Sequence, residues 1–182
     1  MKKIKVKIKA KSSDLKSYIR NIPDFPKPGI LFRDITTLLK DKKAFKVALD
    51  TLTHKFKDKN IDVVVAVEAR GFILGGAIAH RLGAGFVPVR KQGKLPSKTN
   101  SVTYNLEYGT DTLEMHHDAV RPSDKVLIVD DLLATGGTVR AVVDLVGQLK
   151  ARIAGIVFLI ELTDLKGRDK LKGFPIYSLI KY

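Results

Sequence analysis

Short apolar runs rich in Val and Ile recur along this chain between segments of helical periodicity. Runs that fit buried strands lie at 62–67, 85–94, 126–129, 153–160 and 176–180. Apolar residues spaced three and four apart predict helices that begin at Asp41, cover Gly71–Leu82 and extend from Val139 to Leu149. Strands that alternate with helices are typical of an α/β fold, so we expect a mostly parallel central sheet flanked by helices.

Two stretches depart from this alternation. Residues 22–34 contain three prolines and a glycine, which favours a rigid, extended loop with Phe25 and Phe32 buried. A short helix is expected before it, from the capping pair Ser13-Asp14 to Ile22. Residues 95–115 are polar and then alternate, which predicts a hairpin that projects from the body. A long excursion of this kind in a compact domain is usually functional.

The composition describes a globular protein. The chain has 182 residues, of which 45% are hydrophobic and 29% charged, so one domain at 13–182 is the default. Without cysteine, disulfides and thiolate metal sites are excluded. The longest apolar run, 153–160, is too short to span a bilayer, and the basic start of the chain does not resemble a signal peptide. We therefore expect a cytoplasmic protein.

A net charge of +14 favours polyanionic ligands. Six lysines and no acid lie in Met1–Lys11, within a basic tail at 1–12 whose residues 4–10 alternate like an edge strand. The tail fits either an arm for nucleic acid or membrane surfaces, or a solvated terminus. Because it has no aromatic or arginine residue, the second interpretation is favoured, and we expect neither nucleic-acid nor membrane binding.

The stretch 126–138 has the strongest chemical pattern. Its apolar strand leads to Asp130 and Asp131, where we expect the strand to leave the sheet, and then to the small-residue loop Ala134–Thr138. That loop precedes a predicted helix, whose N-terminal N–H groups and dipole favour a phosphate. Acids beside a phosphate require something cationic or hydroxyl-rich, such as a ribose and a divalent cation. The alternative is an ordinary strand–turn–helix with surface acids.

Cations are expected at the same sheet edge. Glu68–Gly71 follows one predicted strand and contains Arg70, while the next strand ends in Arg90, Lys91 and Lys94. Beside a phosphate site these side chains form a candidate pyrophosphate clamp, since Arg offers paired donors and Lys a point charge. Read alone, they fit a plain strand–helix turn and a solvated face. The pair His116-His117 lacks further ligands nearby and is interpreted as surface.

The stretch Val129–Thr138 resembles the phosphoribosyl-pyrophosphate motif of the type I phosphoribosyltransferases. The resemblance runs from about residue 13 to the C-terminus. Pro28–Asp34, Glu107-Tyr108 and Glu161–Arg168 match segments of the members of that family that act on adenine. It implies transfer of ribose 5-phosphate from phosphoribosyl pyrophosphate to adenine, giving AMP and pyrophosphate, with Mg²⁺, in a homodimer that serves purine salvage.

The resemblance also implies a role for each matched residue. Residues 22–34 become an adenine-binding hood and 95–115 a flexible catalytic lid, and a cis peptide is expected near Glu68-Ala69. Mg²⁺ is expected to bind through the substrate, with Asp130 and Asp131 as candidate ligands. The implied residues are Glu107, Asp130, Asp131 and Arg70 for catalysis; Ala134, Thr135, Gly136, Gly137 and Thr138 for the 5′-phosphate; Ala69, Arg70, Arg90, Lys91 and Lys94 for pyrophosphate; Leu31, Phe32, Arg33 and Leu162 for adenine; and Glu107 with Tyr108 in the lid.

Two other functions remain open. The first is a phosphoribosyltransferase for another base, such as a 6-oxopurine or orotate, which Pro28–Asp34 and Glu107-Tyr108 argue against. The second is a non-enzymatic regulator that binds DNA and keeps the phosphoribosyl-pyrophosphate site. That class needs a helix-turn-helix module before the sheet, whereas the residues ahead of Asp62 resemble a hood and two helices.

Overall fold

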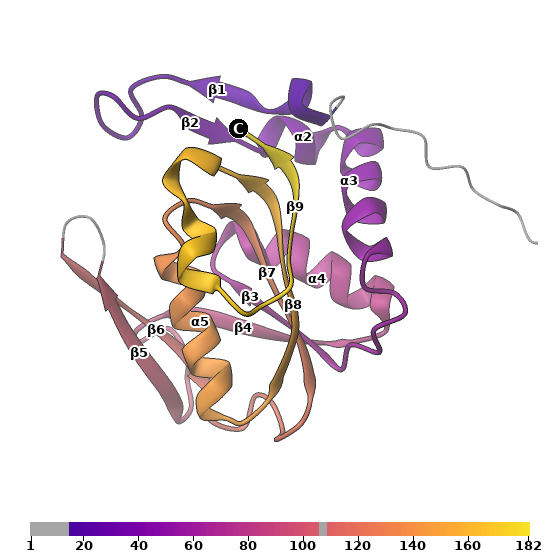
Figure 1. Cartoon of the computed structure of the whole chain (residues 1–182), viewed down its shortest axis with the longest axis vertical. Coiled ribbons are helices and arrows are strands. Elements are labelled where there is room, and N and C mark those ends of the chain that lie inside the picture. Colours follow the sequence, from indigo (N-terminus) through magenta and orange to yellow (C-terminus); the bar gives the residue numbers. More distant parts are fainter. Residues whose placement is uncertain (1–14, 106–108) are drawn as a thin grey trace, which may run out of the picture. The chain divides into compact units, whose positions relative to one another are not determined.

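The structure is a computed structural model, and it describes residues 15–105 and 109–182. The chain divides into two compact units, one ending at Thr51 and the other running from Leu52 to Tyr182. The strand expected at 4–10 and the cap expected at Ser13-Asp14 lie outside the described residues. The helices and strands are labelled in Figure 1.

The second unit contains a seven-stranded sheet with the order β5-β6-β4-β3-β7-β8-β9. Its strands are β3 (Val63–Val67), β4 (Gly85–Lys91), β5 (Thr99–Asn105), β6 (Thr110–His116), β7 (Lys125–Leu133), β8 (Arg152–Glu161) and β9 (Ile176–Lys181). Neighbours from β4 to β9 run parallel, whereas β6 is antiparallel to both β4 and β5. The predicted α/β fold with a mostly parallel sheet is confirmed.

The chain order fixes where the helices lie. Helix α4 (Arg70–Leu82) connects β3 to its neighbour β4, and α5 (Gly137–Gln148) connects β7 to β8 on the other side. Because parallel crossovers are right-handed, connections that leave in opposite directions put their helices on opposite faces of the sheet, as Figure 1 shows. The direction reverses between β3 and β7, so the carboxyl ends of these two strands border the crevice where such sheets bind ligands.

Apolar burial holds this arrangement together. The strand residues Val65, Ile128 and Phe158 are fully buried, as are Val142 and others on the inner side of α5. Burying one such side chain contributes about 1.5–3 kcal/mol. On α4, a Cβ atom on Gly75 would lie 2.6 Å from the Cβ of Ala66, so only glycine lets the helix approach β3 this closely.

The predicted hairpin is present, but it does not project freely from the sheet. Strands β5 and β6 pair from Thr99↔His116 to Asn105↔Thr110. Strand β6 also pairs with β4 through Arg90↔Glu114 and Lys91↔Leu113, so the hairpin extends the main sheet. After β8 come the short 3₁₀ helices η2 (Thr163–Leu165) and η3 (Gly167–Leu171), the latter anchored by the fully buried Leu171.

The first unit contains η1 (Lys16–Tyr18), β1 (Arg20–Ile22), β2 (Phe32–Asp34), α2 (Thr36–Lys40) and α3 (Lys42–His54) up to Thr51. Asp41 caps α3 as predicted, since its Oδ1 accepts the N–H groups of Lys43 and Ala44. The helix predicted through Ile22 is wrong. Residues 20–22 instead pair with β2 in an antiparallel hairpin, held by hydrogen bonds from Arg20 to Asp34.

The expectation that Phe25 is buried is also wrong. Its side chain is 50% exposed, and its ring contacts that of Phe32 edge to face, with centroids 5.1 Å apart. The turn between β1 and β2 also contains a cis bond between Phe25 and Pro26. No helix among the described residues has the length and apolar character needed to cross a membrane.

Candidate functional site

Asp130 and Asp131 lie inside β7 and not beyond it, contrary to expectation. Pairing with β3 stops at Val129, but pairing with β8 continues to Leu133↔Glu161. The two acids are in contact, since the N–H of Asp131 donates a hydrogen bond to Oδ1 of Asp130 at 2.9 Å. Asp131 is buried with its Oδ2 2.9 Å from Nε of Arg70, whereas Asp130 lines a pocket with the loop that follows.

The carboxyl groups of Asp130 and Asp131 make this end of β7 a place that favours positive charge. Burial and the neighbouring Asp131 raise the pKa of the Asp130 carboxyl group above its ordinary value. Burial also raises the pKa of Asp131, and Arg70 opposes part of that rise. Two adjacent carboxyl groups that are costly to ionise are stabilised by a cation or by hydroxyl donors. A ribose or a ribosyl cation supplies such groups.

The loop Ala134–Thr138, called the phosphate loop below, has the geometry of an anion site. Gly136 is the N-cap of α5 with φ +80°, and no side chain caps the helix, so its first N–H groups face the loop. The pocket lined by Asp130 and residues 132–139 has a volume of about 70 Å³. Since a water needs about 10–15 Å³ of such space, the pocket admits a group of phosphate size.

Close backbone packing fixes the phosphate loop from behind. A Cβ atom on Gly136 would collide with the carbonyl oxygen of Gly167, and one on Gly167 would collide with that of Ala134. Arg168, next to Gly167, donates two hydrogen bonds to the buried Glu161 at the end of β8, at 2.6 and 2.7 Å. This bidentate pair lowers the pKa of Glu161 and holds η3 against the loop.

The turn after β3 has the expected backbone, because the peptide between Glu68 and Ala69 is cis. The buried Glu68 carboxylate gathers three donors: Nε of Arg90 at 2.9 Å, Nζ of Lys94 at 2.9 Å and the backbone N–H of Lys91 at 3.0 Å. Burial raises the pKa of Glu68, but these hydrogen bonds together outweigh it and hold the pKa at about 2.

The four predicted pyrophosphate-binding cations therefore lie at one sheet edge, and each is paired with a carboxylate. Arg70 pairs with Asp131, and Arg90 and Lys94 pair with Glu68. The fourth, Lys91, has its Nζ 2.9 Å from Oδ2 of Asp111 on β6. Sequence reasoning grouped the cations correctly but assigned no role to Glu68 or Asp111. Only the pairing of the strands shows which acid meets which cation.

The residues predicted to bind adenine belong to both units. Leu31 is 46% exposed in the first unit, where Phe32 and Arg33 form part of β2 and Arg33 donates to Oδ1 of Asn21. In the second unit, Leu162 is half-buried directly after β8, and its N–H bonds to the carbonyl of Leu133. Glu107 and Tyr108 lie outside the described residues.

The two histidines His116 and His117 differ in burial. His117 is exposed, as expected, but Nε2 of His116 is buried without a hydrogen-bond partner, so the surface interpretation is wrong for His116. The side chain of His116, the last residue of β6, is half-buried. Across residues 15–105 and 109–182, no three His, Asp or Glu side chains are grouped to hold a metal ion.

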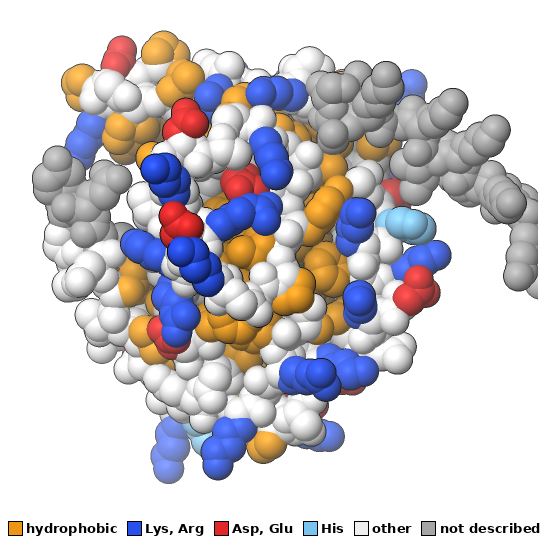
Figure 2. Space-filling model, viewed as in Figure 1, with side chains coloured by type: hydrophobic (Ala, Val, Ile, Leu, Met, Phe, Trp, Pro, Cys, Tyr) orange, Lys and Arg blue, Asp and Glu red, His pale blue; other side chains and the backbone are white. Residues whose placement is uncertain are grey.

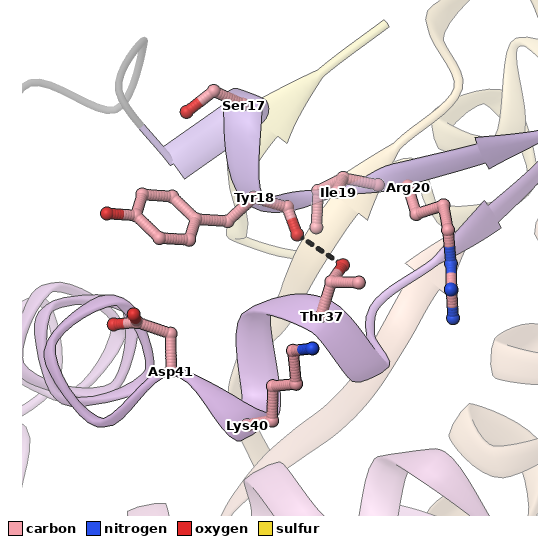
Figure 3. A pocket seen from close by; sticks show the side chains of 7 residues that line it. All are labelled: Ser17, Tyr18, Ile19, Arg20, Thr37, Lys40 and Asp41. Carbon is pink, nitrogen blue, oxygen red and sulfur yellow. Dashed lines mark hydrogen bonds between the residues drawn. The ribbon is translucent and has the colours of Figure 1, made fainter.

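A larger cavity, of about 300 Å³, lies within the first unit and contains none of the predicted site residues. Figure 3 shows its lining side chains, which come from η1, β1 and the α2–α3 region. The Thr37 hydroxyl donates to the carbonyl of Tyr18 across it, at 2.6 Å, and Lys40 and Asp41 form its lower side.

Comparisons with known proteins agree with this geometry. A family model described as phosphoribosyl transferase domain matches residues 36–179. The matched range contains the acid pair Asp130 and Asp131 and the loop Ala134–Thr138. The chain belongs to the phosphoribosyltransferase family.

Particular relatives narrow the family further. The chain is 60% identical over 169 residues to the adenine phosphoribosyltransferase of Clostridium kluyveri, covering 93% of this chain and 98% of that one. The crystal structure of adenine phosphoribosyltransferase from Thermoanaerobacter pseudethanolicus matches with a TM-score of 0.91 and 54% identity, covering 94% and 99%. The Saccharomyces cerevisiae enzyme, complexed with adenine and an imino-altritol bisphosphate, matches with a TM-score of 0.87 and 41% identity, covering 92% and 97%. The resemblance to the adenine-specific members of the family is confirmed.

Proposed function

We propose that this chain is the catalyst of ribose 5-phosphate transfer from phosphoribosyl pyrophosphate to adenine, with AMP and pyrophosphate as products. The observation that carries the proposal is the acid pair beside the phosphate loop at the β3–β7 switch point, in a chain 60% identical to an adenine phosphoribosyltransferase. The activity serves purine salvage.

The reaction is a displacement at the anomeric carbon of the ribose. The bond from this carbon to pyrophosphate breaks, and a ring nitrogen of adenine forms the new bond and then loses its proton. Positive charge develops on the sugar ring, where Asp130 and Asp131 stabilise it and accept hydrogen bonds from the ribose hydroxyls. The phosphate loop holds the 5′-phosphate, which supplies binding energy away from the reacting carbon.

The leaving pyrophosphate is held by the cations of the sheet edge. Arg70, Arg90, Lys91 and Lys94 bind it, and the backbone at Ala69 adds donors. Since each cation is paired in the described structure, the carboxylates of Glu68, Asp111 and Asp131 must share or release their partners when pyrophosphate binds. An exchange of ion pairs of this kind limits the net gain from each contact.

Mg²⁺ belongs to the proposed site. Mg²⁺ is usually bound through one or two carboxylates together with substrate phosphates, and Asp130 and Asp131 supply such a pair. The costly ionisation of both acids fits a cation bound nearby. The metal would neutralise charge on the pyrophosphate as it leaves.

The adenine contacts follow from the family resemblance. Phe32 stacks on the base, the backbone of Leu31 and Arg33 meets its hydrogen-bonding edge, and Leu162 covers its second face. Glu107, next to Tyr108 in the lid, manages the proton on the imidazole side of the base.

A homodimer is also part of the proposal, since in the family the arginine matched by Arg90 reaches the neighbouring subunit's site. In its support, Ile73 on α4 and Phe86 on β4 are 46% and 39% exposed, and the rings of Phe86 and Phe72 contact each other at 5.8 Å. Exposed apolar side chains that lie on adjacent elements are common at subunit contacts. The cytoplasmic location stays a prediction from the sequence.

The test is an assay with phosphoribosyl pyrophosphate, Mg²⁺ and one base at a time. Adenine should be converted to AMP. The kcat/KM for hypoxanthine should be at least about a hundredfold lower, because hypoxanthine reverses the donor and acceptor at the edge read by the backbone, and each mismatch costs about 1–3 kcal/mol. Equal kcat/KM for the two bases would refute the assigned specificity.

Glu107→Leu should lower kcat strongly with an unchanged melting temperature.

A further inference from the structure

The phosphate loop, as assigned from the sequence, has no cation of its own. It offers backbone N–H groups, the hydroxyls of Thr135 and Thr138, and the positive end of α5. That end carries about half an elementary charge, whereas a phosphate monoester carries between one and two negative charges at neutral pH. The Asp130 carboxyl group also lines the pocket. The charge of a bound 5′-phosphate is therefore only partly balanced by these groups.

One lysine lies beside the loop without a role in the family resemblance. The Nζ atom of Lys170 on η3 is 3.9 Å from the point where a Cβ atom on Gly137 would stand. Gly137 is the first residue of α5 and lines the pocket. The segment between β8 and β9, drawn in gold in Figure 1, contains η3. Figure 2 shows Lys and Arg side chains gathered over this part of the surface.

Lys170 differs from the predicted pyrophosphate cations in its pairing. Each of those four is bound to a carboxylate, whereas Lys170 forms no ion pair with any carboxylate of the described residues. Its neighbour Lys172 lies 3.6 Å from Asp169. Of these lysines, Lys170 is thus the one whose charge stays available to a ligand of the phosphate loop without exchange of an ion pair.

The fold also determines the position of Lys170. Its element η3 is held by the fully buried Leu171, by the contact between Gly167 and Gly136, and by the pair of Arg168 with Glu161. The backbone that carries Lys170 is therefore fixed relative to the phosphate loop, and only the side chain has to be ordered on binding. This lowers the entropic cost of recruiting a lysine to a phosphate.

We propose that Lys170 is a further phosphate-binding residue, whose ammonium group contacts the 5′-phosphate of phosphoribosyl pyrophosphate and AMP. The inference rests on the proposed function, because it concerns the same site. Lys170 supplies the point charge that the backbone cradle lacks. It takes no part in the chemistry at the anomeric carbon.

The experiment compares Lys170→Gln with Lys172→Gln, a matched loss of charge two residues away. Calorimetry gives the Kd of each variant for AMP and for adenine, which has no phosphate. Lys170→Gln should weaken AMP binding about tenfold, which corresponds to about 1.4 kcal/mol, and leave adenine binding within twofold. Lys172→Gln should leave both within twofold, and Lys170→Arg should retain most of the AMP affinity.

Each outcome bears on one of the two proposals. AMP affinity of Lys170→Gln within twofold of the unmodified protein would overturn the role of Lys170, as would an equal loss in Lys172→Gln. A parallel loss of adenine affinity would also overturn it, because a phosphate contact cannot act on the free base. If the unmodified protein bound adenine and turned it over but Lys170→Gln behaved normally, only this inference would fail. An unmodified protein that bound neither adenine nor AMP would overturn the proposed function as well.

Discussion

Two adjacent glycines of the phosphate loop serve different purposes. Gly136 has a positive φ, and any side chain there would meet the backbone of Gly167. At Gly137 a Cβ atom would have ordinary contacts, 3.6 Å from the carbonyl of Asn105 and from the ring of Tyr104. The fold therefore requires glycine at position 136, whereas at Gly137 only the proposed phosphate ligand, which has to approach the backbone closely, requires it.

This difference gives a prediction at the residue scale. Gly136→Ala should lower the free energy of unfolding by about 1–3 kcal/mol, through backbone strain and the displaced η3. Gly137→Ala should change it by less than about 0.5 kcal/mol but weaken AMP binding at least about tenfold. Chemical denaturation and calorimetry measure the two effects. Equal stability of the two variants would contradict the assigned roles.

At the element scale, the carboxylate of Asp34 connects the β1–β2 hairpin to the start of α2 through hydrogen bonds. Asp34 at the end of β2 accepts the N–H of Thr36 at 2.9 Å and a hydrogen bond from Nε of Arg20 at 2.9 Å. The bond from the Thr36 backbone, together with the bonds from Arg20 and the Thr36 hydroxyl, outweighs burial and lowers the pKa of Asp34 to about 2. These contacts stabilise the hairpin only while Asp34 is ionised.

The pH dependence follows from that lowered pKa. Because the pKa is lower in the folded state, the contribution of Asp34 is fully present above its ordinary value of 3.8 and is lost as the pH falls toward about 2. Asp34→Asn should therefore lower the melting temperature at neutral pH, and the difference from the unmodified protein should shrink in acid. Scanning calorimetry from neutral pH to about pH 2 tests this.

The control for that experiment is Asp50→Asn, which removes an acid of the same unit from an i,i+4 pair with the exposed Lys46. Such pairs contribute only about 0.3–0.5 kcal/mol, so this variant should follow the unmodified protein at every pH. A constant difference for Asp34→Asn across the pH range would show that its ionisation does not support the hairpin.

At the scale of the whole molecule, the proposal of a homodimer can be tested through the apolar residues of α4 and β4. Sedimentation at micromolar concentration should give twice the mass of the chain. Phe86→Lys should shift the protein toward monomer, since it places a charge among apolar side chains at the contact. The matched control is Leu165→Lys, because Leu165 is 45% exposed on η2. An active monomer of the unmodified protein would contradict the proposal.

The amino-acid sequence by itself determined the elements whose physical cause is local. The apolar runs at 126–129 and 153–160 predicted the buried parts of β7 and β8, and α5 repeats its valines at helical spacing. The phosphate loop was predictable for the same reason, because its small residues, its hydroxyls and the helix that follows are contiguous. The order of the predicted strands placed the four cations at one edge, and motifs of the family added the cis peptide at Glu68-Ala69.

Only the tertiary structure decided how charges and backbones from distant segments meet. Arg20 draws residues 20–22 into a strand because Asp34 lies opposite, and no periodicity at 13–22 encodes that partner. Glu68 and Asp111 became partners of the cations through the pairing of β3, β4 and β6. Lys170 reaches the phosphate loop because Gly167 packs against Gly136, about thirty residues earlier. Such contacts depend on the path of the chain in space, which local patterns of apolar and polar residues leave undetermined.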